Sequence, residues 1–520
     1  MITKWKLANF KCIKQETELN FAPLTILAGP NSSGKSTLLQ SILLIAQTLS
    51  SQLNSRSVVL NGGFVELGQF SDVCSFQSES ESVLIGWECT PLIKPVDRDV
   101  WMKGAFPKIS GTVVFDTQME APSLVPSSRQ PILLKSSTLS VTSPGNNKGN
   151  PVPESTAELV INRDVSKLPP PTNQRENGEE YGFKVELDDN SLEEINRFNP
   201  TKKLSVIGCE LHHFLPHTLA LTALELDSGE PQLGTMYVQT PFRIFNEVKY
   251  LRSFFAGQIK YLGPWREQPR SLYSGTNYHN SVDVGTHGQY TAAILDFYKE
   301  LQIFYVPSSI FKTPKELSTV SDTNNVVECA LVKAVIDWLK YLEVAESVET
   351  HDRGFGYELK IILPGITKPL DLVHVGTGVS QVLPLLVMCL LAPIDSTLII
   401  EQPELHLHPA VQTRLGDFFL AMALSGKQCL IETHSEYLIN RLRLRLALAQ
   451  DDSLNALLKT YFVEKTGLES SFREVSVNEY GAINDWPEGF FDQSLSEVEA
   501  ILMAAMSKRK ARRGGKQCLV

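Results

Sequence analysis

The chain has 520 residues, of which 42% are apolar and 20% charged, the composition of a globular protein with more than one folding unit. Its 48 basic and 58 acidic residues give a net charge of −10, which argues against a surface that attracts nucleic acid everywhere. The eight cysteines include no Cys-x-x-Cys pair, and no apolar run is long enough to span a membrane. We therefore expect a cytoplasmic protein without a zinc ribbon or a disulfide scaffold, and we interpret the basic stretch 507–516 as a solvated terminus.

The first half of the chain predicts many short strands and few helices. Alternating apolar residues predict strands over 5–13, 18–30 and within 62–90. A helix is predicted over 35–50. From about 95 to 240, β-like runs alternate with stretches rich in proline, serine and asparagine, and the sequence contains no internal repeat.

The second half predicts mainly helices, and then an alternation of strands and helices. Helices are predicted over most of 241–262, over 289–303 and over 325–344. Strands are then expected at 357–365, 396–400 and 428–433, with helices at 381–392, 409–424 and 435–449. Such alternation is typical of a parallel sheet covered by helices.

The sequence GPNSSGKS, residues 29–36, matches the phosphate-loop pattern G-x-x-x-x-G-K-[ST]. It follows a predicted strand and opens a predicted helix, so backbone N–H groups and the positive helix end would face a phosphate. Lys35 would supply charge to the β- and γ-phosphates, and Ser36 a hydroxyl to Mg²⁺. The residues expected to contact the nucleotide here are Gly29, Asn31, Ser32, Gly34, Lys35, Ser36 and Thr37.

A second anion site is predicted in HVGTGVSQVLPLL, residues 374–386. The glycines at 376 and 378 free the backbone, and Ser380 is expected to cap the apolar helix that follows. A serine hydroxyl and free N–H groups at a helix start can hold an anion, here through Gly378 and Ser380. Two such sites on one chain suggest half-sites that are completed by dimerisation.

Polar residues follow three predicted strands. Glu401 ends the strand 396–400, where a magnesium ligand is needed at the carboxyl edge of a sheet. His434 follows the strand 428–433, within reach of a γ-phosphate, although a histidine at a strand end is often only a polar cap. Gln69 follows the phosphate loop by some thirty residues, where a glutamine that contacts metal and water could come, or one without any function.

In this order, GPNSSGKS, LGQFSD, GTGVSQ, IIEQPELHLHP and ETHSEYLINRL resemble the Walker A, Q-loop, signature, Walker B/D-loop and switch-histidine motifs of ABC-type ATPase heads. The sequence is most similar to RecF/SMC-like AAA ATPases of the overcoming-lysogenisation-defect (OLD) group, which includes ATPase subunits of prokaryotic antiphage systems. YLGPWREQPR (261–270) and NEYGAINDWPEGFFDQS (478–494) also resemble parts of these ATPases, whereas 95–240 carries no resemblance.

The resemblance implies an α/β fold, an ABC-type ATPase head with a P-loop parallel sheet, covering helices and an antiparallel β-subdomain, interrupted by a β-rich and helical insertion. The implied parts are head residues 1–94, an insertion over 95–354, head residues 355–450 and a C-terminal accessory module over 451–520 with a basic tail. It also implies that Lys35, Ser36 and Glu401 hold Mg·ATP, and that Ser380 reaches the γ-phosphate of a partner chain while His434 senses its own.

The implied function is a slow ATPase that dimerises head to head with ATP and controls a separately encoded effector, such as a nuclease, in antiphage defence. Only 86 residues follow His434, and they contain no Asp-x-Asp, so a nuclease within the same chain is not expected. The alternative is a RecF-like DNA-repair ATPase that clamps DNA directly, which the net charge disfavours. A scaffold in which ATP is purely structural is a third reading.

The stretch IIEQPELHLHP, residues 399–409, places Gln402 where the family usually has a catalytic glutamate. A glutamine can orient an attacking water, because phosphoryl transfer depends mainly on positioning. Pro403 favours an extended backbone at Gln402, which would place Glu404 on the same side, so Glu404 is our candidate base. Alternatively, Glu404 only pairs with a basic residue. For His406 and His408 we prefer a structural role beside the partner head over a metal site.

Overall fold

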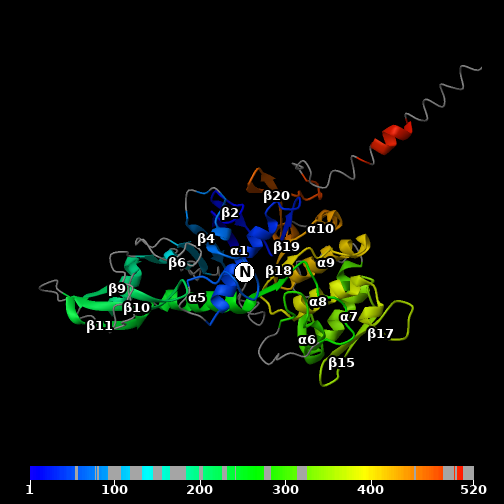
Figure 1. Ribbon diagram of the computed structural model, residues 1–520, viewed down its shortest axis with the longest axis horizontal. Helices are drawn as coiled ribbons and strands as arrows, with labels where there is room; N and C mark the ends of the chain where they lie inside the picture. Colours follow the sequence, from blue (N-terminus) through cyan, green and yellow to red (C-terminus); the bar gives the residue numbers. More distant parts are fainter. Residues whose placement is uncertain are drawn as a thin grey trace, which may run out of the picture.

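The structure is a computed structural model, drawn in Figure 1, and its described residues form two large sheets. The described residues are 1–52, 57–76, 78, 81–91, 107–117, 132–143, 155–163, 183–197, 203–224, 231–240, 242–273, 283–312, 325–449, 453–483, 497 and 500–506. The basic stretch 507–516 and residues 484–494 of the tail motif lie outside this set. Among the described residues, no helix has both the length and the apolar character needed to cross a membrane.

The six-stranded sheet has the order β12-β18-β19-β3-β20-β21 and carries the phosphate loop. Every residue of β3, β18 and β19 is buried, as expected for parallel strands that are covered on both faces. All neighbours in it are parallel except the final pair. The strands are β3 (Leu24–Ala28), β12 (Ile259–Leu262), β18 (Thr397–Glu401), β19 (Gln428–Glu432), β20 (Leu458–Thr466) and β21 (Glu469–Glu474).

Each face of this sheet contributes to a different hydrophobic core, because successive side chains of a strand point to opposite faces. On one face, Ile400 and Ile431 pack in the core with residues of α8 (Thr377–Leu391) and α9 (Pro409–Leu424). On the other, Ile399 and Leu430 pack with residues of α1 (Lys35–Ser50) and of the second sheet. The parallel sheet is therefore the middle layer.

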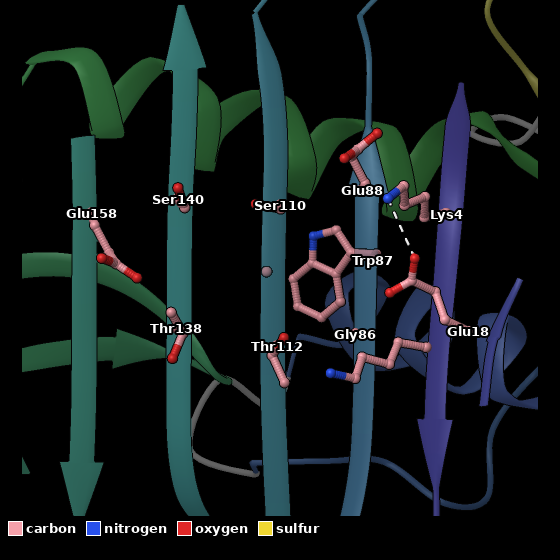
Figure 2. A pocket seen from close by; sticks show the side chains of 12 residues that line it. Lys4, Glu18, Gly86, Trp87, Glu88, Ser110, Thr112, Thr138, Ser140 and Glu158 are labelled. Atoms are coloured by element: carbon pink, nitrogen blue, oxygen red, sulfur yellow. Dashed lines mark ion pairs between the residues drawn. The ribbon is translucent and has the colours of Figure 1, made fainter. Parts of the chain in front are cut away.

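The second sheet is antiparallel, with the order β2-β1-β4-β5-β6-β7-β8. Its inner face joins the core around α1. Its outer face carries hydroxyl and charged side chains, which Figure 2 shows over β1, β4, β5, β6 and β7. The strands are β1 (Ile2–Ala8), β2 (Thr17–Asn20), β4 (Val83–Cys89), β5 (Lys108–Asp116), β6 (Leu133–Ser143), β7 (Ser155–Arg163) and β8 (Phe183–Leu187).

The remaining elements flank these sheets. A three-stranded sheet of β9 (Lys203–His212), β10 (Leu215–Leu224) and β11 (Pro231–Gln239) lies at the end of the molecule opposite α7 and α8 (Figure 1). Further small sheets are β13 (Gln302–Tyr305) with β14 (Val327–Ala330), and β15 (Ser347–Asp352) with β16 (Tyr357–Ile362) and β17 (Leu370–Asp371). Other α-helices in the described part of the chain include α2 (Phe70–Val73), α4 (Asp189–Arg197), α5 (Phe242–Ser253), α6 (Thr291–Tyr298), α7 (Leu331–Tyr341), α10 (Glu436–Leu448) and α11 (Ser453–Leu457).

The predicted fold class is confirmed: an α/β protein with a parallel P-loop sheet and an antiparallel β-subdomain. Several predicted elements were wrong. The single strand expected over 18–30 is two strands, and the described residues of 62–90 form the short helix α2 and the strand β4. The helix expected over 325–344 begins as β14, because this segment pairs with β13. The helix expected over most of 241–262 is confirmed, since residues 242–258 are helical before the segment ends as β12.

The sequence blocks proposed as domains do not coincide with the layers of the fold. Strands β4 and β5 pair across residue 94, and β12 from the block 95–354 is an edge strand of the P-loop sheet. The segment 458–474 adds two further strands to the same sheet. Long-range pairing of this kind leaves no local signal in the sequence.

Candidate nucleotide-binding site

The phosphate loop joins β3 to α1, as predicted. Gly29 has φ +145° and Gly34, the N-cap of α1, has φ +107°, conformations that residues with side chains rarely adopt. A Cβ atom at Gly29 would collide with the backbone carbonyl of Val463 in β20, and one at Gly34 with Ser470 and Cys12. The C-terminal strands therefore press directly on the loop, and both glycines are required.

Lys35 lies folded over this loop. Its Nζ donates hydrogen bonds to the carbonyl oxygens of Gly29 (3.0 Å) and Pro30 (2.7 Å). Burial lowers the pKa of Lys35, while the nearby carboxylates of Glu432 and Glu404 raise it. The ammonium group is thus held at the mouth of the loop, where the phosphates of a nucleotide would lie.

Ser36 meets two carboxylates at the carboxyl ends of β18 and β19. Its Oγ donates to Oε2 of Glu432 (2.8 Å), and Glu432 is the register partner of Glu401. Glu401 also accepts a hydrogen bond from the Tyr261 hydroxyl (2.9 Å). Burial, and then the neighbouring Glu432, raises the pKa of Glu401 to about 7; burial also raises the pKa of Glu432.

Glu404 is buried and binds the segment that follows β19. Its Oε2 accepts from the Thr433 hydroxyl (2.9 Å), and its Oε1 accepts from the backbone N–H of His434. Burial raises the pKa of Glu404, although these hydrogen bonds and Lys35 oppose that rise. Burial, and then Lys35, lowers the pKa of His434 to about 4, so its imidazole is neutral at neutral pH.

The backbone of Gln402 is not extended, so that prediction was wrong. Its φ is +46°, in the left-handed region, and its N–H donates to the carbonyl of Glu432 (2.8 Å). This bond continues the pairing of β18 with β19 by one residue before the chain turns. Glu404 therefore reaches the edge of β19 through the turn after Gln402, and not through the alternation of an extended strand.

Ser380 does not cap its helix, contrary to the prediction. Helix α8 begins four residues earlier than expected, at Thr377, and its N-cap is Gly376. Ser380 lies inside the first turn, buried, and its hydroxyl donates to the carbonyl of Thr377 (2.7 Å). A Cβ at Gly378 would meet Leu407 of the IIEQPELHLHP stretch at 3.7 Å, whereas Gly376 has open space around it.

The other predicted site residues are mostly exposed or make local contacts. Gln69 is exposed at the start of α2, and its backbone N–H donates to Asp72 (2.8 Å). Asn31 and Ser32 are exposed on the phosphate loop, while the hydroxyl of Thr37 contacts the Cys12 sulfur (3.2 Å).

The two histidines of the IIEQPELHLHP stretch lie at the start of α9 and just before it. His408 is the N-cap of α9, with its side chain accepting from the N–H of Ala410 (3.2 Å), and His406 is exposed. Among the residues that the structure describes, no group of three or more His, Cys, Asp or Glu side chains could hold a metal ion. A structural role for His408 as a helix cap is therefore shown, whereas contact with a partner head stays a prediction.

Sequence reasoning missed three residues of the site. Glu432 was passed over although it ends a strand beside the switch histidine, and strand ends on one sheet edge were the signal used for Glu401. Tyr261 and Arg266 come from the quoted YLGPWREQPR stretch, but nothing local shows that β12 pairs with β18. Burial lowers the pKa of Arg266 to about 10, and its Nε and Nη1 are buried without a hydrogen-bond partner among the described residues.

The donor set of this centre suits magnesium. Ser36 and Glu401 offer a hydroxyl and a carboxylate oxygen at one sheet edge, the hard ligands that Mg²⁺ prefers, and Glu432 is hydrogen-bonded to Ser36 beside them. Mg²⁺ is usually held by one or two carboxylates together with the phosphates of a substrate. The residues therefore fit a metal that arrives with the nucleotide.

Comparisons with protein families match three segments of the chain. Residues 1–118 match the model of a AAA ATPase domain, and residues 308–440 match a AAA domain named for the AbiEii toxin of type IV TA systems. Residues 458–501 match a family described as a protein of unknown function, DUF3696. A search of curated proteins gave no significant match.

Solved structures similar to this chain include heads of SMC proteins, each at 11% sequence identity. The SMC head bound to the C-winged helix domain of ScpA has a TM-score of 0.37 and covers 92% of this chain and 98% of its own. The head from Thermotoga maritima has a TM-score of 0.34 and covers 92% and 99%. The head with an extended coiled coil bound to the C-terminal domain of ScpA, from Pyrococcus furiosus, has a TM-score of 0.32 and covers 96% and 99%.

Proposed function

The chain is an ATP-binding ATPase, and we propose that ATP joins two copies head to head to control a separately encoded effector. A nuclease in prokaryotic antiphage defence is the effector and the setting that the sequence resemblance favours. The phosphate loop supplies one half of each composite site, and the start of α8 from the partner supplies the other. Hydrolysis then separates the two heads.

The observation that carries this proposal is the open N-terminus of α8. The helix has 15 residues and no side-chain cap, and both Gly376 and Thr377 are exposed. Free N–H groups at such a helix end attract anions. Apart from α8 itself and the adjacent residues of the chain, only Leu407 lies within 4 Å of a Cβ placed at Gly378, so no residue of the phosphate loop packs against this position.

Position 376 offers a sharp test of dimerisation. Gly376 has φ −60° and open space, so a side chain fits there, and Asp or Asn would cap α8 well. Gly376→Asp should keep ATP binding but lose the ATP-dependent doubling of mass in sedimentation, because its carboxylate repels the partner's γ-phosphate. Gly376→Asn, which is neutral and nearly isosteric, should dimerise like the parent.

Lys35→Ala is the control for nucleotide binding, because it should abolish both ATP binding and ATP-dependent dimerisation. If Gly376→Asp dimerises with ATP as well as Gly376→Asn does, the α8 start is not part of the interface. If the parent stays monomeric with saturating ATP, head-to-head dimerisation itself is wrong.

We propose that Gln402 orients the attacking water and that Glu404 accepts its proton. His434 would sense the γ-phosphate. What supports this is the position of Glu404 beside Lys35 and directly against the backbone of His434. Glu404→Gln should slow single-turnover ATP hydrolysis by about 10²–10⁴-fold, the usual cost of losing a general base. ATP affinity should stay unchanged, and a hydrolysis rate equal to that of the parent would show that Glu404 is not the base.

Control of an effector is tested by co-expression with the product of the adjacent gene. A complex whose nuclease activity differs between ATP-bound and Lys35→Ala proteins supports the proposal, as does loss of phage protection with either Lys35→Ala or Gly376→Asp. Stimulation of ATP hydrolysis by DNA, without any partner protein, would instead favour the DNA-clamping alternative.

A further inference from the structure

Glu432 ends β19 and lies within the nucleotide site, but none of the motifs found in the sequence gives it a role. It is 3% exposed, lies in register with Glu401, and accepts the hydrogen bond of the Ser36 hydroxyl at 2.8 Å. Parallel strands are about 4.8 Å apart, so the two carboxylates face the same small volume. A buried carboxylate is costly unless it is paired, and Glu432 has Ser36 and the nearby Lys35 to offset its charge.

We infer that Glu432 is a positioning residue for the magnesium of Mg·ATP, acting through Ser36. A serine hydroxyl has one hydrogen and two lone pairs. Because Glu432 takes that hydrogen, the lone pairs of Ser36 Oγ are left for the metal. Residues that orient metal ligands in this way typically change metal affinity when they are removed.

The hydrogen bond to Glu432 is enough to orient the Ser36 hydroxyl, so no contribution from Gln69 is needed. Gln69 is the residue for which the sequence predicted a role at the metal. Gln69 is exposed at the start of α2, whereas Glu432 is fixed by the pairing of β19 with β18 on one side and β3 on the other. A carboxylate held by three strands is a rigid support, which a ligand needs in order to stay aligned. The inference depends on nucleotide binding alone and not on dimerisation or on an effector.

The experiment measures Mn²⁺ affinity in the presence of a non-hydrolysable ATP analogue, using the electron paramagnetic resonance signal of free Mn²⁺. Glu432→Gln should weaken Mn²⁺ binding by about 10- to 100-fold, the usual effect of losing an orienting partner. Affinity for the analogue in EDTA should not fall, and the melting temperature should not drop, because the change removes one of two adjacent buried charges. Gln69→Ala serves as the control and should bind Mn²⁺ like the parent.

A double-mutant cycle shows whether Glu432 acts through Ser36. In a Ser36→Ala background, Glu432→Gln should have little further effect on Mn²⁺ affinity, since the hydroxyl that it orients is gone. The inference is overturned if Glu432→Gln binds Mn²⁺ as the parent does, or if its effect is equally large with Ser36→Ala. Because the chain is assayed as a nucleotide complex, a monomeric result in sedimentation leaves this test intact.

Discussion

Charged side chains around the parallel sheet are less exposed to solvent than those on the outer face of the antiparallel sheet. In the parallel half, Glu401, Glu432 and Asp417 are almost fully buried, and each is bound by specific partners. On the outer face of the antiparallel sheet, Lys4 and Glu18 form an ion pair at 3.3 Å while remaining about half exposed, as Figure 2 shows. Both halves are rich in strands, but the nucleotide site groups several carboxylates where water is excluded. In the antiparallel sheet, Asp116 at the end of β5 is also buried, and Arg163 pairs with it at 2.7 Å.

This difference in exposure decides where a charged side chain can interact strongly enough to contribute to binding or catalysis. Exposed pairs are screened by water and contribute little, whereas buried charges interact strongly and depend on every partner. A site that must bind phosphates and a cation benefits from the second environment. The following predictions test this contrast, beginning with the largest expected effect.

Asp417 should show the greatest sensitivity to loss of charge. It is fully buried in α9, where it accepts hydrogen bonds from Arg441 and Arg445 of α10 and from the Tyr341 hydroxyl of α7. Asp417→Asn leaves the arginines without their counter-charge and should lower the free energy of unfolding by about 3–5 kcal/mol. Chemical denaturation measures this, and a loss below about 1 kcal/mol would contradict the contrast.

Lys427 should make stability depend on pH. Its ammonium group is buried and donates to the carbonyls of Cys389 and Leu390 at the end of α8, and burial lowers its pKa from 10.5 to about 8. Between about pH 8 and 10.5 the unfolded chain therefore binds a proton that the folded protein has released, so folded stability rises with pH. Relative to Lys427→Met, parent stability should gain up to about 1.4 kcal/mol per pH unit in this window.

The matching measurement is urea denaturation of both proteins from pH 7 to 10. Subtracting the free energy of unfolding of the variant from that of the parent at each pH cancels the contributions of groups that titrate in both proteins, such as tyrosines and cysteines. A difference that is flat across this range would show that Lys427 keeps an ordinary affinity for its proton.

Glu18 should show the smallest effect. Glu18→Gln makes the same chemical change as Asp417→Asn, but on the open face of the antiparallel sheet. We expect a loss of about 0.2–1 kcal/mol in the free energy of unfolding, and less at high salt, because exposed ion pairs are screened. If denaturation shows a loss as large as that of Asp417→Asn, the two environments are not as different as the burial indicates.

Prediction from sequence succeeded where the signal was local. The helix 35–50 was placed with its observed bounds because a glycine-rich turn precedes a run of helix-forming apolar residues. The ends of β18 and β19 were predicted to within one residue from short apolar runs followed by polar residues. The structure places Glu404 and His434 near Lys35, and Glu401 near Ser36, whereas their roles in catalysis stay predictions.

It failed where distant segments decide the conformation. The expected cap at Ser380 was displaced by four residues, since a Gly-x-Gly sequence allows several helix starts and packing chooses one. The left-handed backbone of Gln402 contradicts the preference set by Pro403, because the N–H of Gln402 is used to bond β19. Pairing of β12 with β18 brought Tyr261 to Glu401 across 140 positions.

The sequence by itself determined the phosphate loop, the α/β class and the order of the strand ends, because these depend on residue types within one turn or one strand. Tertiary structure decided which carboxylate supports Ser36, since register between β18 and β19 is set by pairing and not by spacing along the chain. It also decided that the C-terminal strands β20 and β21 press on Gly29 and Gly34, a contact across more than 430 residues that only the folded sheet creates.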